Sequence, residues 1–166
     1  SSGAALKNCF TPAVAYASTA DTFLVVWQRT VVASTVSDIE AQLANGNGSL
    51  SGANFFVQQG SNPFSHSAPA LAYNRARNEF LVVWERYDGS ASLTDIYGRL
   101  VTGNGQPLQP ASIEYARMTV SNTKPAVAAL PTASPIGQYL VIWELHYAAG
   151  DRDIYARPGA GDGTPA

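Results

Sequence analysis

Polar and aromatic side chains gather where the sequence predicts loops between apolar segments. The set comprises Glu85, Arg86, Tyr87, Asp88, Glu144, His146, Tyr147 and His66. Carboxylates and a guanidinium make directional, charge-assisted hydrogen bonds, and exposed aromatic rings supply flat apolar surfaces. Such a set suits the binding of a glycan or a peptide, and an ordinary solvated loop surface is the alternative interpretation.

Motifs of known enzyme active sites are missing from the sequence. It contains no G-x-S-x-G elbow, P-loop, H-E-x-x-H helix or C-x-x-C pair, and it has two histidines and one cysteine. Such motifs hold a nucleophile, a phosphate or a metal in a defined geometry. We therefore predict no catalytic residue, no metal site and no cofactor, and a protein that is not an enzyme. Asp38, Asp95 and Asp153 stand where strands are expected to begin, and there Asp typically accepts hydrogen bonds from backbone N–H groups.

Composition narrows the classes of partner. The 166 residues include 13% charged side chains, with a formal charge of -2 and no cluster of Lys or Arg. A nucleic-acid-binding surface needs such a cluster, and a membrane-spanning helix needs about 20 consecutive apolar residues. The sequence predicts a secreted or cell-surface protein with no nucleic-acid partner and no membrane insertion. Its single cysteine, Cys9, is expected to be a small buried side chain.

One unit is repeated three times along the chain. An apolar segment that ends in tryptophan recurs at Trp27, Trp84 and Trp143, with spacings of 57 and 59 residues. In every unit a Pro-Ala segment precedes the tryptophan, and an Asp-Ile pair and a Gly-Asn-Gly or Gly-Asp-Gly step follow it. Self-similarity at a nearly fixed period indicates a repeat architecture.

Each unit is expected to form an antiparallel sheet of four strands. In unit 2 the strands are PALAY (69–73), FLVVW (80–84), DIYGR (95–99) and residues 113–121. These segments are short, β-branched or aromatic, and no 3.6-residue periodicity persists. FLVVW is apolar throughout, so we expect sheets to cover both of its faces. Tandem four-stranded sheets predict an all-β fold of β-propeller type, with a β-sandwich or a β-helix as competing folds.

The units also resemble β-propeller-like repeats of proteins secreted or displayed by bacteria. Their pattern is P-x-V-A, F-x-V-x-W, D-I-Y-x-R and a glycine-rich turn, matched by PALAY, FLVVW, DIYGR and GNGQP in unit 2. The resemblance covers nearly the whole chain and implies an extracellular propeller-like module without implying an activity. Unit 1 departs from the pattern, because Asp38-Ile-Glu-Ala-Gln42 replaces DIYGR.

Three units are too few for a propeller, which typically has about four to eight blades. The sequence assigns residues 11–67 to unit 1, 68–123 to unit 2 and 124–166 to unit 3, which lacks a fourth strand. Residues 1–10 are expected to complete another copy by strand complementation. This assembly strand comprises Leu6, Lys7, Asn8, Cys9 and Phe10. The prediction is a homo-oligomer, as a ring or a filament, and the alternative is a piece of a longer propeller.

These features together predict a function without catalysis. The low charge and the unpaired strand edges favour a structural or adhesive extracellular protein that assembles with itself. A carbohydrate-binding propeller lectin is the alternative. In either case the three tryptophans are expected to be buried between units rather than to bind a sugar.

Overall fold

The fold is built of strands in the part of the chain that the computed structural model describes, residues 6–109, 112–130 and 138–165. The strands are β1 (Lys7–Ala17), β2 (Thr22–Val31), β3 (Ser37–Asn45), β4 (Leu50–Gln58), β5 (Phe64–Asn74), β6 (Glu79–Asp88), β7 (Leu93–Thr102), β8 (Ile113–Ala116), β9 (Asn122–Leu130), β10 (Gln138–Ala148) and β11 (Asp151–Gly159). The same residues include no helix that could span a membrane.

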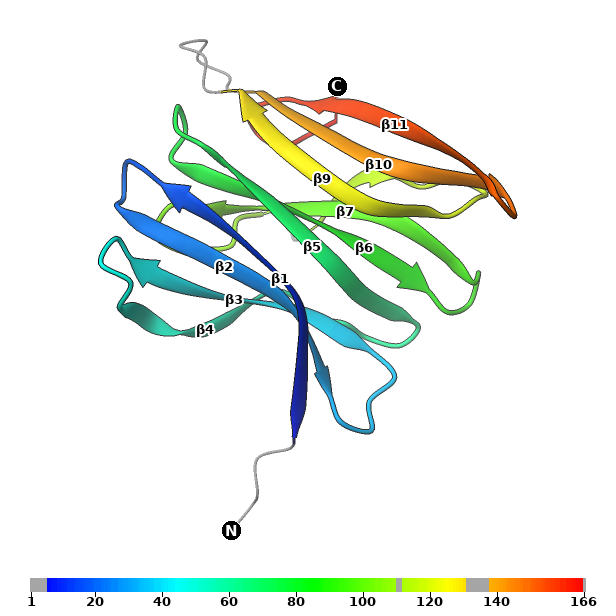
Figure 1. The fold of residues 1–166 in the computed structure, drawn as a ribbon, viewed down its shortest axis with the longest axis horizontal. Coiled ribbons are helices and arrows are strands. Elements are labelled where there is room, and N and C mark those ends of the chain that lie inside the picture. The colour runs from blue at the N-terminus through cyan, green and yellow to red at the C-terminus, as the bar shows by residue number, and fades with distance from the viewer. Residues whose placement is uncertain (1–5, 110–111, 131–137, 166) are drawn as a thin grey trace.

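Each repeat unit forms its own antiparallel sheet, and the three sheets lie side by side in chain order (Figure 1). Their strand orders are β1-β2-β3-β4, β5-β6-β7-β8 and β9-β10-β11. Gly48, Gly105 and Gly163 take φ values of 84°, 84° and 79° in the glycine-rich turns, a region that glycine enters at low steric cost. The predicted all-β fold of antiparallel units is thus confirmed. Among the described strands, no sheet closes on itself.

A kink divides the first strand of every unit. Thr11, Ala68 and Lys124 have φ values of 47°, 47° and 52°, and each precedes a proline. The pairing with the second strand shifts at each kink. The sequence predicts a unit boundary here because proline usually stands at the start or edge of a strand. The structure corrects these boundaries, since the sheets span residues 7–58, 64–116 and 122–159.

The predicted assembly strand is part of unit 1. Lys7–Phe10 pair with Gln28–Val31 of β2, and the corresponding residues of unit 2 pair in the same register. The Leu6 carbonyl accepts a hydrogen bond from the Val32 N–H at 2.8 Å. These residues therefore extend β1 instead of forming a separate strand, and residues 1–5 lie outside the described part. Cys9 is exposed, contrary to expectation, because none of the described residues covers this side of β1.

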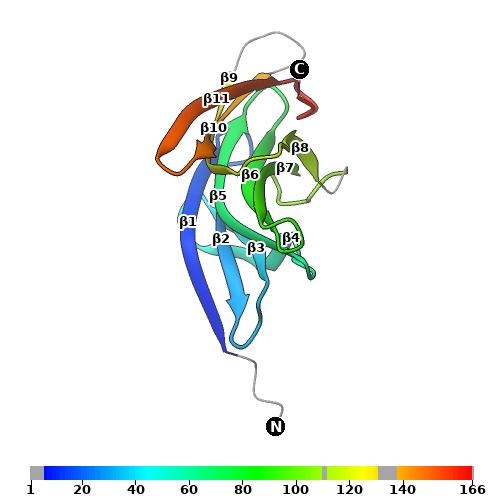
Figure 2. The ribbon, with the colours of Figure 1, turned by 90° about the vertical axis from the view of Figure 1, so that its right-hand side faces the viewer.

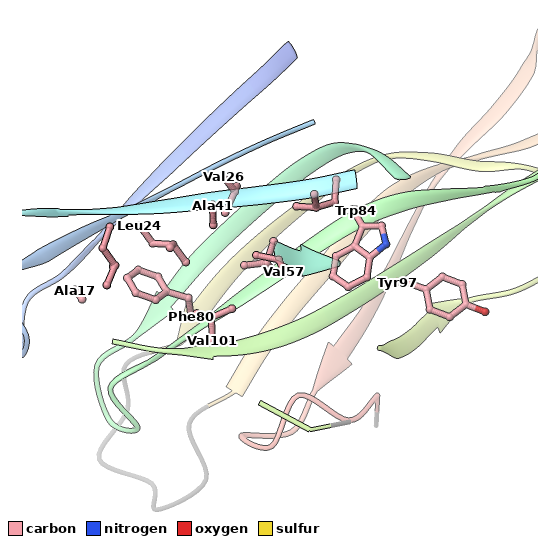
Figure 3. Packing of buried hydrophobic residues seen from close by; sticks show 12 residues of the cluster. Ala17, Leu24, Val26, Ala41, Val57, Phe80, Trp84, Tyr97 and Val101 are labelled. Carbon is pink, nitrogen blue, oxygen red and sulfur yellow. The ribbon is translucent and has the colours of Figure 1, made fainter. Parts of the chain in front are cut away.

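Apolar side chains of β6 pack in both directions, as predicted for FLVVW. Phe80, Val82 and Trp84 join a core cluster with unit 1 (Figure 3), whereas Leu81 and Val83 join a second cluster with unit 3. All five side chains have 0% exposure. We call the side of a unit that packs on the preceding unit its front face, and the opposite side its back face.

An arginine links unit 2 to unit 1, and another links unit 3 to unit 2. Arg99 of β7 donates to the Val57 carbonyl of β4 at 2.8 Å, and Arg157 of β11 donates to the Tyr115 carbonyl of β8 at 3.1 Å. Both arginines end the D-I-Y-x-R motif, so this repeated motif includes a contact between units. Unit 1 has Gln42 instead, whose amide donates to carbonyls of its own sheet.

Replacing Arg99 by glutamine is expected to lower the free energy of unfolding by about 1–3 kcal/mol, because the buried Val57 carbonyl loses a charged donor. Chemical denaturation measures this loss. Arg75→Gln is the control, because its side chain is exposed and a surface substitution usually changes stability by less than about 0.5 kcal/mol. Equal effects of the two substitutions would contradict a stabilising link through Arg99.

Candidate functional site

The predicted ligand-binding residues lie in strands and not in one loop surface. Glu85, Arg86, Tyr87 and Asp88 end β6, whereas Glu144, His146 and Tyr147 belong to β10 and His66 to β5. Successive side chains of a strand point to opposite faces of the sheet, so these residues separate into different groups. Asp88 accepts a hydrogen bond from the Ser90 N–H at 2.9 Å in the turn after β6, and Tyr87 is 41% exposed.

One group connects the back faces of units 2 and 3 through Lys124. Glu85 accepts hydrogen bonds from the Ser67 hydroxyl at 3.0 Å and from the Lys124 backbone N–H at 2.8 Å. The Lys124 ammonium donates to Glu144 at 2.9 Å. Since Lys124 occupies the kink of β9, Glu85 holds the start of unit 3 in place. This contact gives Glu85 a structural task between units.

Glu144 is the most highly paired carboxylate of this group. Lys124 and Arg152 both donate to it, at 2.9 Å and 3.3 Å, and the Lys124 hydrogen bond is the main cause that lowers the pKa of Glu144. His146 Nε2 lies 3.5 Å from Glu144 and 2.8 Å from the Thr123 hydroxyl. A carboxylate held in its ionised form is suited to binding a cation or a hydroxyl donor, and it is a poor general acid.

His66 and Arg86 belong to a second group, buried between units 1 and 2. The Trp84 indole N–H donates to His66 Nδ1 at 3.1 Å. The Arg86 guanidinium lies over the rings of Phe64 and Tyr97, at 4.6 Å and 3.8 Å from their centroids. These side chains line a cavity of only about 70 Å³, whereas ligand sites for small molecules usually have about 300–1,000 Å³. The group fills the space between the units and has no room for a sugar.

The corresponding space between units 2 and 3 is an open cleft of about 400 Å³. Its lining residues are Glu114, Tyr115, Ala116, Arg117, Met118, Trp143, Tyr155, Ala156 and Arg157. Trp143 and Tyr155 form an aromatic pair with ring centroids 6.3 Å apart. Glu114 and Arg117 add an acceptor and a donor and are both exposed. We call this space the unit 2–3 cleft.

Two buried positions of unit 3 differ from the equivalent positions of unit 2. The pairing register places Leu145 and Asn122 of unit 3 where unit 2 has Arg86 and His66. Neither replacement spans the space that the Arg86 guanidinium fills between its two rings. The Trp143 indole N–H, whose counterpart in unit 2 donates to His66, has no partner among the described residues. This nitrogen is buried, so the polar groups that the cleft offers to a ligand are those of Glu114 and Arg117.

Most residues of this cleft are not among the predicted ligand-binding residues. Of the predicted ligand-binding residues, Tyr147 lies beside it, with its hydroxyl 2.5 Å from that of Tyr155. Trp143 was expected to be buried, and it is only 4% exposed, yet it lines the cleft. No motif in the sequence marks these residues, because the fold brings together segments that are far apart in the chain.

No family model and no curated protein matches the chain, but the fold is similar to that of solved structures. An N-acetylgalactosamine deacetylase from F. plautii in complex with blood group B trisaccharide has 8% identity and a TM-score of 0.55, over 96% of this chain and 53% of that chain. An alpha-L-arabinanase of Penicillium chrysogenum complexed with arabinobiose has 12% identity and a TM-score of 0.57, over 92% of this chain and 46% of that chain. An endo-arabinase of Bacteroides thetaiotaomicron has 10% identity and a TM-score of 0.55, over 95% of this chain and 56% of that chain.

These likenesses support a propeller-like all-β fold, and the chain spans about half the length of each structure. All three are enzymes named for action on carbohydrates, which contradicts the predictions of a non-catalytic structural or adhesive protein and of a protein that is not an enzyme. A lectin without catalysis agrees with them only weakly. The prediction that the protein is not an enzyme was wrong because it relied on the absence of active-site motifs from other enzyme classes. The likeness to these structures is one of fold and does not depend on such motifs.

Proposed function

We propose that this chain is part of a carbohydrate-processing enzyme and that the unit 2–3 cleft binds a sugar unit of the substrate. The cleft carries the proposal through its volume of about 400 Å³ and its lining by Trp143, Tyr155 and Glu114. Sugar rings have apolar faces that stack on aromatic side chains and hydroxyl groups that need polar partners. Enzymes named for arabinan and N-acetylgalactosamine share the fold, and we take carbohydrates of these kinds as the substrate class.

The catalytic step needs more than this cleft supplies. Hydrolysis of a glycosidic bond usually uses two carboxyl groups, about 5–10 Å apart, one as acid and the other as base or nucleophile. The cleft lining contains one carboxylate, Glu114, which accepts a hydrogen bond from the Tyr97 hydroxyl at 2.7 Å. We assign to the cleft the binding of substrate, and we expect further blades of the complete propeller to contribute to the reaction.

A complete propeller forms part of this proposal. The three sheets cover about half of each similar enzyme, so we propose that further units, from a longer chain or from other copies, complete the ring. Secretion or display at the cell surface suits an enzyme of polysaccharides, and the 13% share of charged residues is consistent with it. A bound glycan is then the partner that the cleft recognises.

Titration of the protein with arabinobiose and with N-acetylgalactosamine-containing oligosaccharides tests this proposal. We expect calorimetric binding of at least one sugar, together with a change in tryptophan fluorescence from Trp143. Glu114→Gln removes a charged acceptor, which should weaken binding by about 10- to 100-fold, because Glu114 lines the cleft. Asp88→Asn is the control, since Asp88 lies in the turn after β6. Absence of binding to both sugar classes, or equal weakening by both substitutions, would reject the assignment.

A further inference from the structure

The two outer faces of the array carry the side chains that are buried at the contacts between units. We propose that a second copy of this chain covers them, so that the front face of unit 1 in one copy packs on the back face of unit 3 in the other. The contacts of unit 2 with its two neighbours provide the template for this interface. The interface is separate from the unit 2–3 cleft, so it does not depend on the proposed function.

The back face of unit 3 exposes an apolar surface. Leu140, Ile142 and Ile154 are exposed by 47%, 37% and 70%. The equivalent side chains of unit 2 pack on unit 3 and have 0% exposure; they are Leu81, Val83 and Ile96. Burying large apolar side chains stabilises a contact by about 1.5–3 kcal/mol for each fully buried side chain. This face is therefore expected to gain as much from a cover as the back face of unit 2 does.

The front face of unit 1 exposes the complementary surface. Val14 and Tyr16 of β1 are exposed by 60% and 43%, and the Tyr16 ring lies 4.9 Å from that of Phe23. In unit 2 the equivalent residues of β5, Leu71 and Tyr73, pack against the core cluster shared with unit 1. Each outer face thus matches one half of a contact that the chain already makes twice.

Polar groups on the two faces also correspond to the template. Glu85 on the back face of unit 2 accepts the N–H of Lys124 at the next kink, at 2.8 Å. Glu144 is its equivalent on the back face of unit 3 and is 22% exposed at its side chain. The equivalent kink on the front face of unit 1 is Thr11, with a φ of 47°. In the proposed contact Thr11 of one copy lies opposite Glu144 of the other.

Gln42 explains why unit 1 fits this position. Arg99 and Arg157 need a carbonyl of the fourth strand in the preceding unit. Gln42 replaces them in unit 1, and its amide is satisfied by carbonyls of its own sheet, including that of Ser51 at 2.9 Å. Unit 1 therefore needs no carbonyl of a fourth strand in the copy that covers its front face.

The arrangement of the sheets determines the kind of assembly. Units 1 and 3 lie at opposite ends of the array (Figure 1 and Figure 2), and the two outer faces are different surfaces, so the contact is head-to-tail. If two copies make this head-to-tail contact with each other through both of their outer faces, the resulting ring contains twice the three units of one chain. Six units lie within the range of about four to eight blades found in propellers.

The mass in solution tests the contact, measured by light scattering during size exclusion. We expect about twice the 17.5 kDa of one chain. Ile142→Asp and Val14→Arg each introduce a charge on one outer face, so each variant alone should be monomeric. A mixture of the two variants should recover the dimer. In the mixed dimer the unmodified front face of the Ile142→Asp copy meets the unmodified back face of the Val14→Arg copy. A face-to-face dimer of identical surfaces would show no such rescue.

Val32→Arg is the matched control. Val32 is 48% exposed, nearly the same as Leu140, and lies after the end of β2. It should leave the dimer intact. A monomeric wild-type protein at all concentrations would overturn the proposal, and so would a dimer that survives both Ile142→Asp and Val14→Arg. Circular dichroism of each variant verifies that the strands remain folded.

Discussion

Replacing Trp84 by alanine is expected to lower the free energy of unfolding by about 3–5 kcal/mol, the range found for large aromatic residues in cores. Trp84 has 0% exposure and packs between the sheets of units 1 and 2 (Figure 3). The substitution removes this apolar area and leaves a cavity, and it deprives His66 Nδ1 of the indole donor at 3.1 Å. Urea denaturation followed by circular dichroism measures the loss.

Trp27 provides the matched comparison, because it occupies the same position of unit 1. It lies on the front face that no other unit covers, and it is only half-buried. Trp27→Ala is therefore expected to cost less than half as much as Trp84→Ala. The comparison is made in the Val14→Arg background, so that an assembly does not cover Trp27. Equal losses would mean that the contact between units adds nothing to the stability of its tryptophan.

The protein is expected to lose about 3 kcal/mol of stability as the pH falls from about 6.5 to about 4, because of His66. Burial, aided by the nearby Arg86 charge, lowers the pKa of His66 from 6.5 to about 4. In this window the unfolded chain binds a proton that the folded chain excludes. The stabilising contribution is therefore complete above pH 6.5 and disappears as the pH falls to the folded-state pKa.

Urea denaturation at pH 7.5, 5.5 and 4.5 measures this dependence, and His66→Asn is the control. Asparagine occupies the equivalent position of unit 3, as Asn122, and it offers the Trp84 indole an acceptor that does not titrate. The variant should show a flatter pH dependence between 4.5 and 6.5 than the wild type. An unchanged slope would mean that His66 does not cause the pH dependence.

Local patterns in the sequence were sufficient for the strands and for their grouping into units. Apolar, β-branched segments such as FLVVW can only be satisfied with cover on both faces, and Phe80 to Trp84 are buried as this pattern predicts. The glycines of the hairpins have the positive φ that tight turns need. Asp38 accepts the Gly60 N–H at 2.9 Å, in keeping with the structural role expected of these aspartates.

The predictions from the sequence that failed concern where strands begin and which segments pair with one another. Proline suggested strand starts at positions 12, 69 and 125, whereas the preceding residue kinks a continuous strand. No pattern in the sequence identified a pairing partner for Lys7–Phe10. In the structure they pair with β2, as Phe64–Ser67 pair with β6. Such pairings depend on which segments meet in space, and no local pattern encodes them.

The sequence by itself determined that the chain is an all-β repeat protein of three units, since period, composition and turn residues are local properties. It also predicted tryptophans buried between units, which is right for Trp84 and Trp143 and wrong for the half-buried Trp27. Only the tertiary structure decided which polar residues come together. Glu85, Arg86, Glu144 and His66 look alike in the sequence, yet alternation along the strands sends them to different interfaces. The cleft at Trp143 is lined by side chains of β8, β10 and β11, and they meet only because two sheets pack against each other.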